Sequence, residues 1–220
     1  MRFALLHGFA GDPAAWAGVD LDATAYALPG HGGGPVAASW DGNLAQVAAM
    51  LRADELVVGY SLGARVALGL VATGRIARAL LVSVNPGIAD GERAARRASD
   101  ARWAELLRAD GMAAFVAAWE AQPLFATQSR VAPERLAARR ARRLALDPEQ
   151  LARSLETMGL AEMPDYRGAL DRVALIAGAD DARYAAIAAA APRHQLVAGA
   201  GHDVPLEQPA ALAAAIRALS

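Results

Sequence analysis

Residues 56–70 read LVVGYSLGARVALGL, a short apolar run followed by Gly-x-Ser-x-Gly and then by a helical pattern. This order predicts a buried strand, a sharp turn and a helix, which is the context of a nucleophile elbow. Gly59 and Gly63 allow close packing at the strained turn, so that Ser61 is pushed out at the carboxyl edge of a sheet. The N-terminus of the next helix favours negative charge that develops near the serine. The stretch predicts a catalytic serine; an incidental serine in a glycine-rich turn is the alternative.

The overall composition excludes several classes of protein. The 220 residues carry a net charge of −1, which indicates no nucleic-acid or anionic-membrane partner. With no cysteine, disulfides, thiol nucleophiles and thiolate metal sites are excluded. The apolar run at residues 3–6 is too short for a signal peptide, and no run approaches the ~18 apolar residues of a membrane span. We expect a cytoplasmic protein with no membrane span, either a monomer or a homo-oligomer.

Short apolar runs alternate with helical patterns along most of the chain. The predicted strands are residues 3–6, 24–28, 56–58, 79–84, 173–177 and 195–198. Such alternation predicts an α/β fold with a mostly parallel sheet of about six strands flanked by helices. Residues 90–163 lack strand signals and predict helices at 91–110, 112–121, 133–146 and 148–158. We therefore expect a core of residues 1–89 and 164–220, with residues 90–163 inserted after the fourth strand as a helical cap.

A serine hydroxyl needs an adjacent imidazole, itself held by a carboxylate, to react near neutral pH. His202 is the best candidate for the imidazole, because it comes late in the chain and sits in a glycine-flanked loop after a strand. His7 and His31 lie in glycine-rich loops and are interpreted as structural or pocket-lining residues. His194 lies at the start of a strand and is expected to be solvated.

The orienting acid and the oxyanion donors are predicted from their places after strands. Asp180 and Asp181 both follow the strand at 173–177 and qualify as the acid, whereas Asp203 is expected to point away from the site. An oxyanion hole needs two backbone donors, and the candidates are the N–H groups of Leu62 and Phe9.

One arginine stands apart from the others. Arg65 lies one turn into the helix after the elbow, near the strand ends, and an arginine there indicates a substrate with carboxylates. The arginine run at 139–143 is expected to form a solvated helix face. The sequence contains no phosphate loop, metal-ligand cluster or dinucleotide fingerprint, so no metal or other cofactor is expected.

Several motifs together resemble the α/β-hydrolase superfamily and, within it, the 2-succinyl-6-hydroxy-2,4-cyclohexadiene-1-carboxylate synthase family of menaquinone biosynthesis. The broad resemblance rests on residues 7–9 (HGF), 28–32 (LPGHG), 59–63 (GYSLG) and 201–202 (GH). The narrower one adds residues 63–65 (GAR), 85–87 (NPG), 99–103 (SDARW), 119–125 (WEAQPLF), 178–184 (GADDARY) and 207–209 (EQP).

This resemblance implies an elimination rather than a hydrolysis. The family removes pyruvate from 2-succinyl-5-enolpyruvyl-6-hydroxy-3-cyclohexene-1-carboxylate, a small-molecule polycarboxylate. By the match, a Ser-His-Asp catalytic triad acts as the base, and the expected members are Ser61, His202 and, in preference to Asp180, Asp181. The expected substrate-binding residues are Arg65, Arg96, Arg143, Tyr60 and Trp119, with Arg139, Arg140 and Arg142 competing for the place of Arg143.

Two other functions remain as alternatives at this point. The same triad could serve a carboxylic-ester or thioester hydrolase. A non-enzymatic ligand-binding protein on a hydrolase fold is the second alternative, and it predicts an incomplete triad, whereas candidates for all three members are present.

Overall fold

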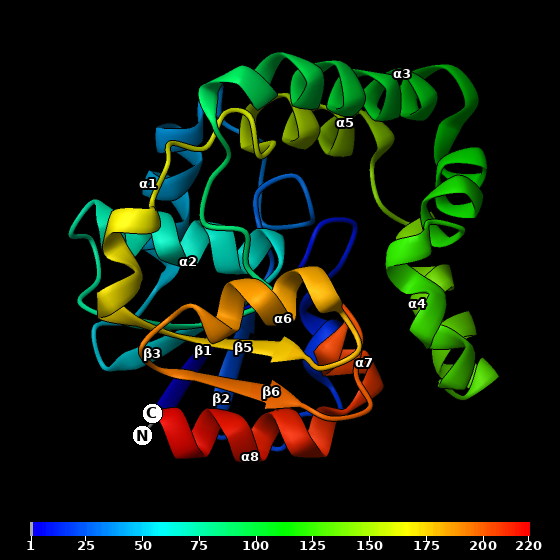
Figure 1. Cartoon of the computed structure of the whole chain (residues 1–220). Helices are drawn as coiled ribbons and strands as arrows, with labels where there is room; N and C mark the ends of the chain where they lie inside the picture. Colours follow the sequence, from blue (N-terminus) through cyan, green and yellow to red (C-terminus); the bar gives the residue numbers. More distant parts are fainter. Residues whose placement is uncertain (1) are drawn as a thin grey trace.

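The computed structural model describes residues 2–220 and shows one parallel sheet with helices on both faces (Figure 1). Its strand order within the described residues is β2-β1-β3-β4-β5-β6, and every neighbouring pair is parallel. The strands are β1 (Arg2–Leu6), β2 (Ala23–Tyr26), β3 (Glu55–Tyr60), β4 (Ala79–Val82), β5 (Val173–Gly178) and β6 (His194–Val197). The predicted fold class, a parallel sheet of about six strands, is confirmed.

The register of the central strands brings their carboxyl ends to one edge of the sheet. Leu6 of β1 pairs with Gly59 of β3, and Tyr60 of β3 pairs with Val82 of β4. Strands β4 and β5 are buried along their whole length, as expected for strands covered on both faces. Loops that follow several strands therefore meet at this edge, where ligands bind in open α/β sheets.

Helices cover the two faces of the sheet with separate apolar clusters. One face packs under α1 (Trp40–Met50), α2 (Leu62–Ala72) and α6 (Ala182–Ala189). The other packs under η1 (Pro13–Trp16) and α8 (Pro209–Leu219), which lies below the sheet in Figure 1. The short elements η3 (Arg167–Arg172) and α7 (Val204–Glu207) complete this part of the chain. No helix in residues 2–220 is both long and apolar enough to span a membrane.

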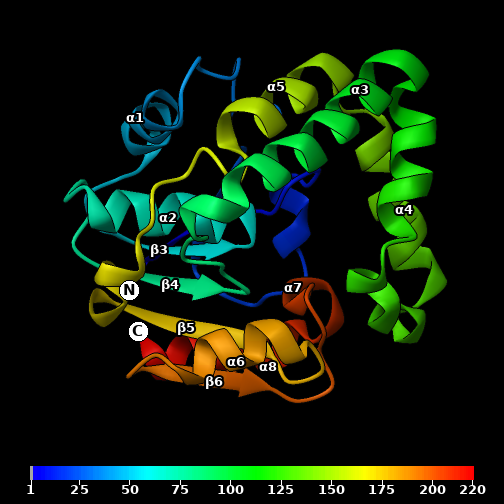
Figure 2. The ribbon, with the colours of Figure 1, turned by 45° about the horizontal axis from the view of Figure 1, so that its top comes forward.

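The segment between β4 and β5 is helical and lies over the carboxyl edge of the sheet (Figures 1 and 2). This insertion consists of α3 (Asp90–Glu120), η2 (Pro123–Arg130), α4 (Pro133–Leu144) and α5 (Pro148–Met158). Helices α3 and α5 run side by side, while α4 stands at one side of the sheet. The predicted break between residues 110 and 112 is a kink at Gly111, whose φ of 72° interrupts a continuous helical run.

Two buried histidines join the loop after β1 to the loop after β2. Nε2 of His7 accepts a hydrogen bond from the Leu28 N–H (3.1 Å), and Nε2 of His31 accepts one from the Ala10 N–H (3.1 Å). Each ring therefore carries its proton on Nδ1, which donates to the carbonyl of Gly8 or Pro29. Burial lowers the pKa of His7 to about 4, and burial with the nearby His7 lowers the pKa of His31 to about 3. Both rings have a structural role as neutral groups.

These histidines predict an acid-dependent loss of stability. Because the unfolded chain binds protons near pH 6.5 and the folded rings do not, their stabilisation is present above pH 6.5 and declines as the pH falls toward 4. Each ring contributes a slope of about 1.4 kcal/mol per pH unit in that window. His31→Gln keeps one acceptor and one donor but cannot titrate. Urea unfolding between pH 7 and 4 should show a shallower decline for this variant, and an unchanged slope would contradict the assignment.

Candidate active site

The turn between β3 and α2 holds Ser61 in a strained conformation. Ser61 has φ 52° and ψ −106°, a left-handed φ that residues other than glycine seldom adopt. A Cβ on Gly59 would lie 2.3 Å from the Gly63 carbonyl oxygen, and one on Gly63 would lie 2.2 Å from the carbonyl oxygen of Leu6. Only glycine fits at these two positions, so the Gly-x-Ser-x-Gly spacing is a packing requirement.

Ser61, His202 and Asp181 form a continuous chain of hydrogen bonds. Nε2 of His202 lies 3.1 Å from Oγ of Ser61, and Nδ1 of His202 lies 3.1 Å from Oδ2 of Asp181. Asp180, the alternative acid, instead pairs with Arg130 at the surface (2.7 Å). Of the two predicted carboxylates, only Asp181 contacts the imidazole. This arrangement allows His202 to accept the serine proton while Asp181 fixes the tautomer.

The carboxyl group of Asp181 stays ionised beside the imidazole. Burial raises the pKa of Asp181, but hydrogen bonds from His202 and from the backbone N–H groups of Tyr184 and Arg183 outweigh burial, so the pKa lies below its ordinary value. Asp181 also caps α6, because Oδ1 accepts a hydrogen bond from the Tyr184 N–H (3.2 Å). The ionised acid holds the imidazole through its Nδ1 nitrogen.

Residues that sequence reasoning missed hold the His202 loop. Oγ of Ser83 donates to the His202 carbonyl oxygen (2.9 Å), and Glu207 accepts hydrogen bonds from the N–H groups of Gly201 and Asp203. The Tyr184 ring lies 4.5 Å from the His202 ring, centre to centre. Glu207 and Tyr184 stand in motifs that carry the family resemblance, but the sequence assigns them no role, and a serine directly after β4 carries no signal in a single sequence.

Two backbone donors from residues that line the cavity beside Ser61 lack partners within residues 2–220. No described residue accepts a hydrogen bond from the N–H of Phe9 or of Leu62, the two predicted oxyanion donors. The Phe9 loop is held on either side, because the Ala10 N–H donates to His31 and the Gly11 N–H donates to the Gly8 carbonyl. Leu62 begins α2, so the helix N-terminus adds positive potential at the same place.

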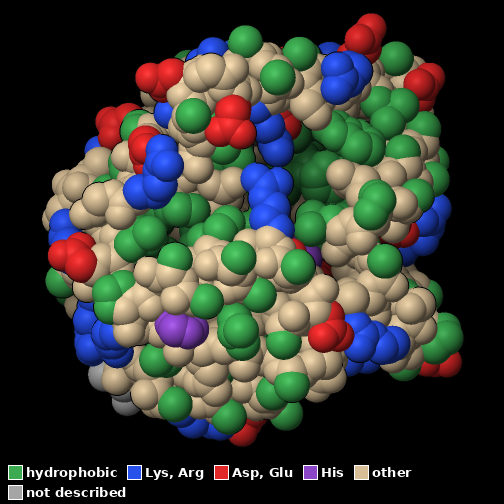
Figure 3. All heavy atoms as spheres, in the orientation of Figure 1, with side chains coloured by type: hydrophobic (Ala, Val, Ile, Leu, Met, Phe, Trp, Pro, Cys, Tyr) green, Lys and Arg blue, Asp and Glu red, His purple; other side chains and the backbone are tan. Residues whose placement is uncertain are grey.

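A cavity of about 540 Å³ lies between this edge and the insertion, and its opening is visible in Figure 3. Aromatic side chains form part of the wall, where the rings of Phe9 and Trp119 lie 5.1 Å apart, centre to centre. Trp119 also stacks on the buried Phe115, with ring centres 5.4 Å apart. Nε1 of Trp119 is buried and finds no acceptor among the described residues, so it remains available as a donor. The ring of Tyr60 is buried beside His202, and burial raises the pKa of this phenol well above its ordinary value.

Arg65 and Arg96 both line the cavity, but only Arg96 is paired with a carboxylate in the part of the chain that the structure describes. Nη1 of Arg65 donates to the Met158 carbonyl (2.8 Å), and the guanidinium lies over the Trp40 ring. No described carboxylate forms an ion pair with Arg65. Burial and the charge of Arg96 lower the pKa of Arg65 to about 10, so it stays cationic near neutral pH. Arg96 is held by two hydrogen bonds to Asp100 through Nε (2.9 Å) and Nη2 (2.7 Å).

The prediction that the arginine run at 139–143 is solvated is wrong for part of the run. Arg139, Arg142 and Arg143 line the cavity, whereas Arg140 does not. The side chain of Arg143 is 7% exposed and binds Glu120 (2.9 Å) and the Ala10 carbonyl (3.2 Å). Arg139 and Arg143 are four residues apart and so share one face of α4, which is directed at the core. Arg142 bridges to Asp12 (2.9 Å).

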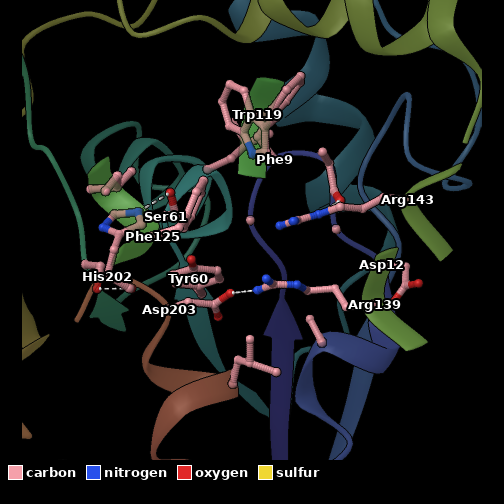
Figure 4. A pocket seen from close by; sticks show the side chains of 18 of the residues that line it. Phe9, Asp12, Tyr60, Ser61, Trp119, Phe125, Arg139, Arg143, His202 and Asp203 are labelled. Atoms are coloured by element: carbon pink, nitrogen blue, oxygen red, sulfur yellow. Dashed lines mark hydrogen bonds and ion pairs between the residues drawn. The ribbon is translucent and has the colours of Figure 1, made fainter. Parts of the chain in front are cut away.

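The prediction that Asp203 points away from the site is also wrong. Asp203 is buried, and its Oδ2 lies 2.5 Å from Nη1 of Arg139 (Figure 4). The pairing partner lies 64 positions earlier in the chain, on the insertion. A buried carboxylate requires such a partner, and the sequence around His202 does not reveal it.

The parallel sheet and the serine elbow are those of an α/β hydrolase, and the chain belongs to the alpha/beta hydrolase family, whose model matches residues 3–215. The chain is 35% identical over 227 residues to a 2-succinyl-6-hydroxy-2,4-cyclohexadiene-1-carboxylate synthase of Salmonella schwarzengrund (strain CVM19633), covering 93% of this chain and 88% of the synthase. A synthase of the same name from Klebsiella pneumoniae (strain 342) is 35% identical over 232 residues, covering 96% and 90%. At this identity and coverage, the chain belongs with these synthases, which are enzymes.

A solved structure agrees with these relatives. The structure of MenH from S. aureus has a TM-score of 0.90 and 26% sequence identity to this chain. The match covers 100% of this chain and 92% of that one. Because it covers the whole of this chain, the match includes the insertion as well as the sheet.

Gly63→Ala tests the packing requirement at the elbow. The added methyl group would overlap the Leu6 carbonyl, so the backbone must move, and we expect a loss of about 1–3 kcal/mol in the free energy of unfolding. Gly91→Ala is the matched control, because a Cβ there has nothing within 4 Å and alanine favours a helix. Urea unfolding of both variants measures the difference. Equal stabilities of the two variants would show that the elbow tolerates a side chain.

Proposed function

We propose that this protein removes pyruvate from 2-succinyl-5-enolpyruvyl-6-hydroxy-3-cyclohexene-1-carboxylate, forming 2-succinyl-6-hydroxy-2,4-cyclohexadiene-1-carboxylate in menaquinone biosynthesis. The observation that carries the proposal is the chain of hydrogen bonds from Ser61 to Asp181 at the base of an arginine-lined cavity. The 35% identity to synthases of that name supports the choice of substrate. We place the reaction in the cytoplasm, with residues 90–163 as a cap on a core of residues 1–89 and 164–220.

The proposed chemistry is a proton abstraction followed by loss of a leaving group. His202 accepts the Ser61 proton, and the serine oxygen takes a ring proton from the carbon that carries the succinyl group. The electron pair moves through the ring, forms the second carbon–carbon double bond and breaks the carbon–oxygen bond to the enolpyruvyl group. That group leaves as the enolate of pyruvate and takes up the proton that His202 holds, which restores the neutral imidazole. The resulting enol becomes the keto form in water.

The two unpartnered backbone donors suit the charge that forms in this step. Removing the ring proton places negative charge on the oxygen of the adjacent succinyl ketone. The N–H groups of Phe9 and Leu62 would stabilise that oxygen, and such fixed donors act without reorganising during the reaction. Trp119 and Tyr60 would pack against the ring of the substrate.

Three arginines are proposed to bind the three carboxylates of the substrate. Arg65 uses one Nη group on Met158, Arg96 gives Nε and Nη2 to Asp100, and Arg143 gives Nε and Nη1 to Ala10 and Glu120. Each guanidinium therefore keeps at least one nitrogen without a partner among the described residues. The protein contacts hold these groups in place, which lowers the entropic cost of binding.

Ser61→Ala tests the role of the serine. Because the alanine cannot take the ring proton, pyruvate release should fall by about 10³-fold or more. The fold should be kept, since alanine only deletes an oxygen at the cavity surface, and circular dichroism checks this. A variant that releases pyruvate at nearly the wild-type rate would show that Ser61 is not the base.

Arg65→Met tests the binding of a carboxylate. Methionine keeps the apolar stem near Trp40 but removes the charge, and one charge-assisted hydrogen bond contributes about 1.5–3 kcal/mol. We expect KM for the enolpyruvyl substrate to rise about 10-fold or more. Arg97→Met is the control, because Arg97 pairs with Glu162 outside the cavity. The same KM for both variants would exclude Arg65 from substrate binding.

A further inference from the structure

The insertion contacts the two residues that flank His202 in the chain. On one side, a Cβ at Gly201 would lie 2.2 Å from Oγ1 of Thr127, so η2 packs directly on this backbone. On the other side, Oδ2 of Asp203 binds Nη1 of Arg139 (2.5 Å) and Nε2 of Gln128 (3.3 Å). Nη2 of Arg139 also donates to Oε1 of Gln128 (2.5 Å). These side chains form a closed triangle from η2 and α4 to the His202 loop.

The charged pair in this triangle is withdrawn from water. The side chain of Arg139 is 11% exposed and that of Asp203 is 8% exposed. Figure 4 shows the two groups facing each other beside Tyr60, at the base of the cavity. Removing one member of a buried ion pair leaves the other charge uncompensated, which costs far more than loss of a surface pair. The position of Asp203, and with it the adjacent His202, is therefore coupled to the position of α4.

The core and the insertion hold the same loop from different sides. Ser83 binds the His202 carbonyl from the end of β4, and Glu207 binds the N–H groups on either side of His202. These core contacts fix the backbone of the loop. The insertion adds contacts to the Asp203 side chain and to the Gly201 backbone, which restrict how the loop can tilt toward Ser61.

Helix η2 also contacts the loop that carries Asp181. Arg130, the last residue of η2, pairs with Asp180 (2.7 Å), the neighbour of Asp181. The Phe125 ring, near the start of η2, lies 6.4 Å from the His202 ring. The loop that carries His202 and the loop that carries Asp181 therefore both contact η2.

We propose that Arg139 and Asp203 are positioning residues, which hold the His202 ring in line with Ser61. Activation of the serine then depends on the packing of η2 and α4 against the His202 loop. The inference rests on the proposed role of His202 as the base for Ser61. It does not depend on the identity of the substrate. The competing role for Arg139, binding a substrate carboxylate, predicts an effect on charged substrates alone.

Phenylmethylsulfonyl fluoride separates these two roles because it carries no charge. Oγ of Ser61 forms a bond to sulfur, fluoride leaves, and the serine proton passes to His202 and then to water. The rate of labelling, followed by the mass of the intact protein, therefore reports the activation of Ser61 without any need for a carboxylate site. Ser61→Ala gives the unlabelled reference.

The variants are Arg139→Met, Asp203→Asn and the double variant. A small displacement of a catalytic group costs one to two orders of magnitude, so labelling should slow about 10-fold in each single variant. The double variant buries no unpaired charge and should fold well, and it should label no more slowly than the slower single variant. Arg139→Lys, which keeps the charge, should recover part of the rate.

Arg108→Met is the matched control, because it removes an arginine that pairs with Glu149 and Glu156 within the insertion, away from His202. It should label at the wild-type rate, and thermal unfolding checks that all variants are folded. Wild-type labelling rates in both Arg139→Met and the double variant would overturn the positioning role. Failure of the wild-type protein to release pyruvate would instead contradict the proposed function and leave this comparison intact.

Discussion

The close approach of the β3–α2 turn to the loop after β1 is the constraint on which the site depends. Two glycines allow the backbone of this turn to touch carbonyl oxygens that any side chain would displace. The approach forces Ser61 into a left-handed conformation and directs its hydroxyl at His202. Leu62, one of the two proposed oxyanion donors, begins the helix directly after this turn. The His202 loop is held separately, by Ser83 and Glu207.

The charges around the cavity follow a second pattern, in which most arginines are tethered by a carboxylate of the protein. Arg96 is held by Asp100, Arg143 by Glu120 and Arg139 by Asp203, and these pairs fix the orientation of each guanidinium. Arg65 differs, since a backbone carbonyl and an aromatic ring hold it and its charge is not offset by an ion pair. This buried guanidinium is therefore well placed to attract an anion. The tethered arginines supply geometry, while Arg65 supplies a charge that no ion pair within residues 2–220 offsets.

Local sequence patterns predict the elements whose conformation depends mainly on residues that are close together in the chain. The strands, the elbow and the break near Gly111 follow from apolar runs and from glycine, and the order of Ser61, the acid and His202 follows from the order of the strands. The choice between Asp180 and Asp181 does not follow, because both residues lie in the same loop. Resemblance favours Asp181, and the structure shows that only Asp181 contacts the imidazole.

Contacts between distant parts of the chain are the part that a single sequence hides. Asp203 is predicted to point outward as a loop residue next to His202, whereas Arg139 reaches it from the insertion. The arginine run is predicted to be solvated because arginines on alanine-rich helices mostly face water, yet three of these side chains line the cavity. His7 and His31 are recognisable as loop residues, but their bonds to the opposite loops require the folded chain.

The most direct test of the account compares two reactions of one preparation of the wild-type protein. One is pyruvate release from the enolpyruvyl cyclohexene carboxylate, and the other is hydrolysis of a short, neutral aryl ester at the same serine. The account predicts that kcat/KM for pyruvate release exceeds that for the ester, because only the polycarboxylate uses the arginines. Rapid hydrolysis of the ester without any release of pyruvate would contradict it and identify a hydrolase.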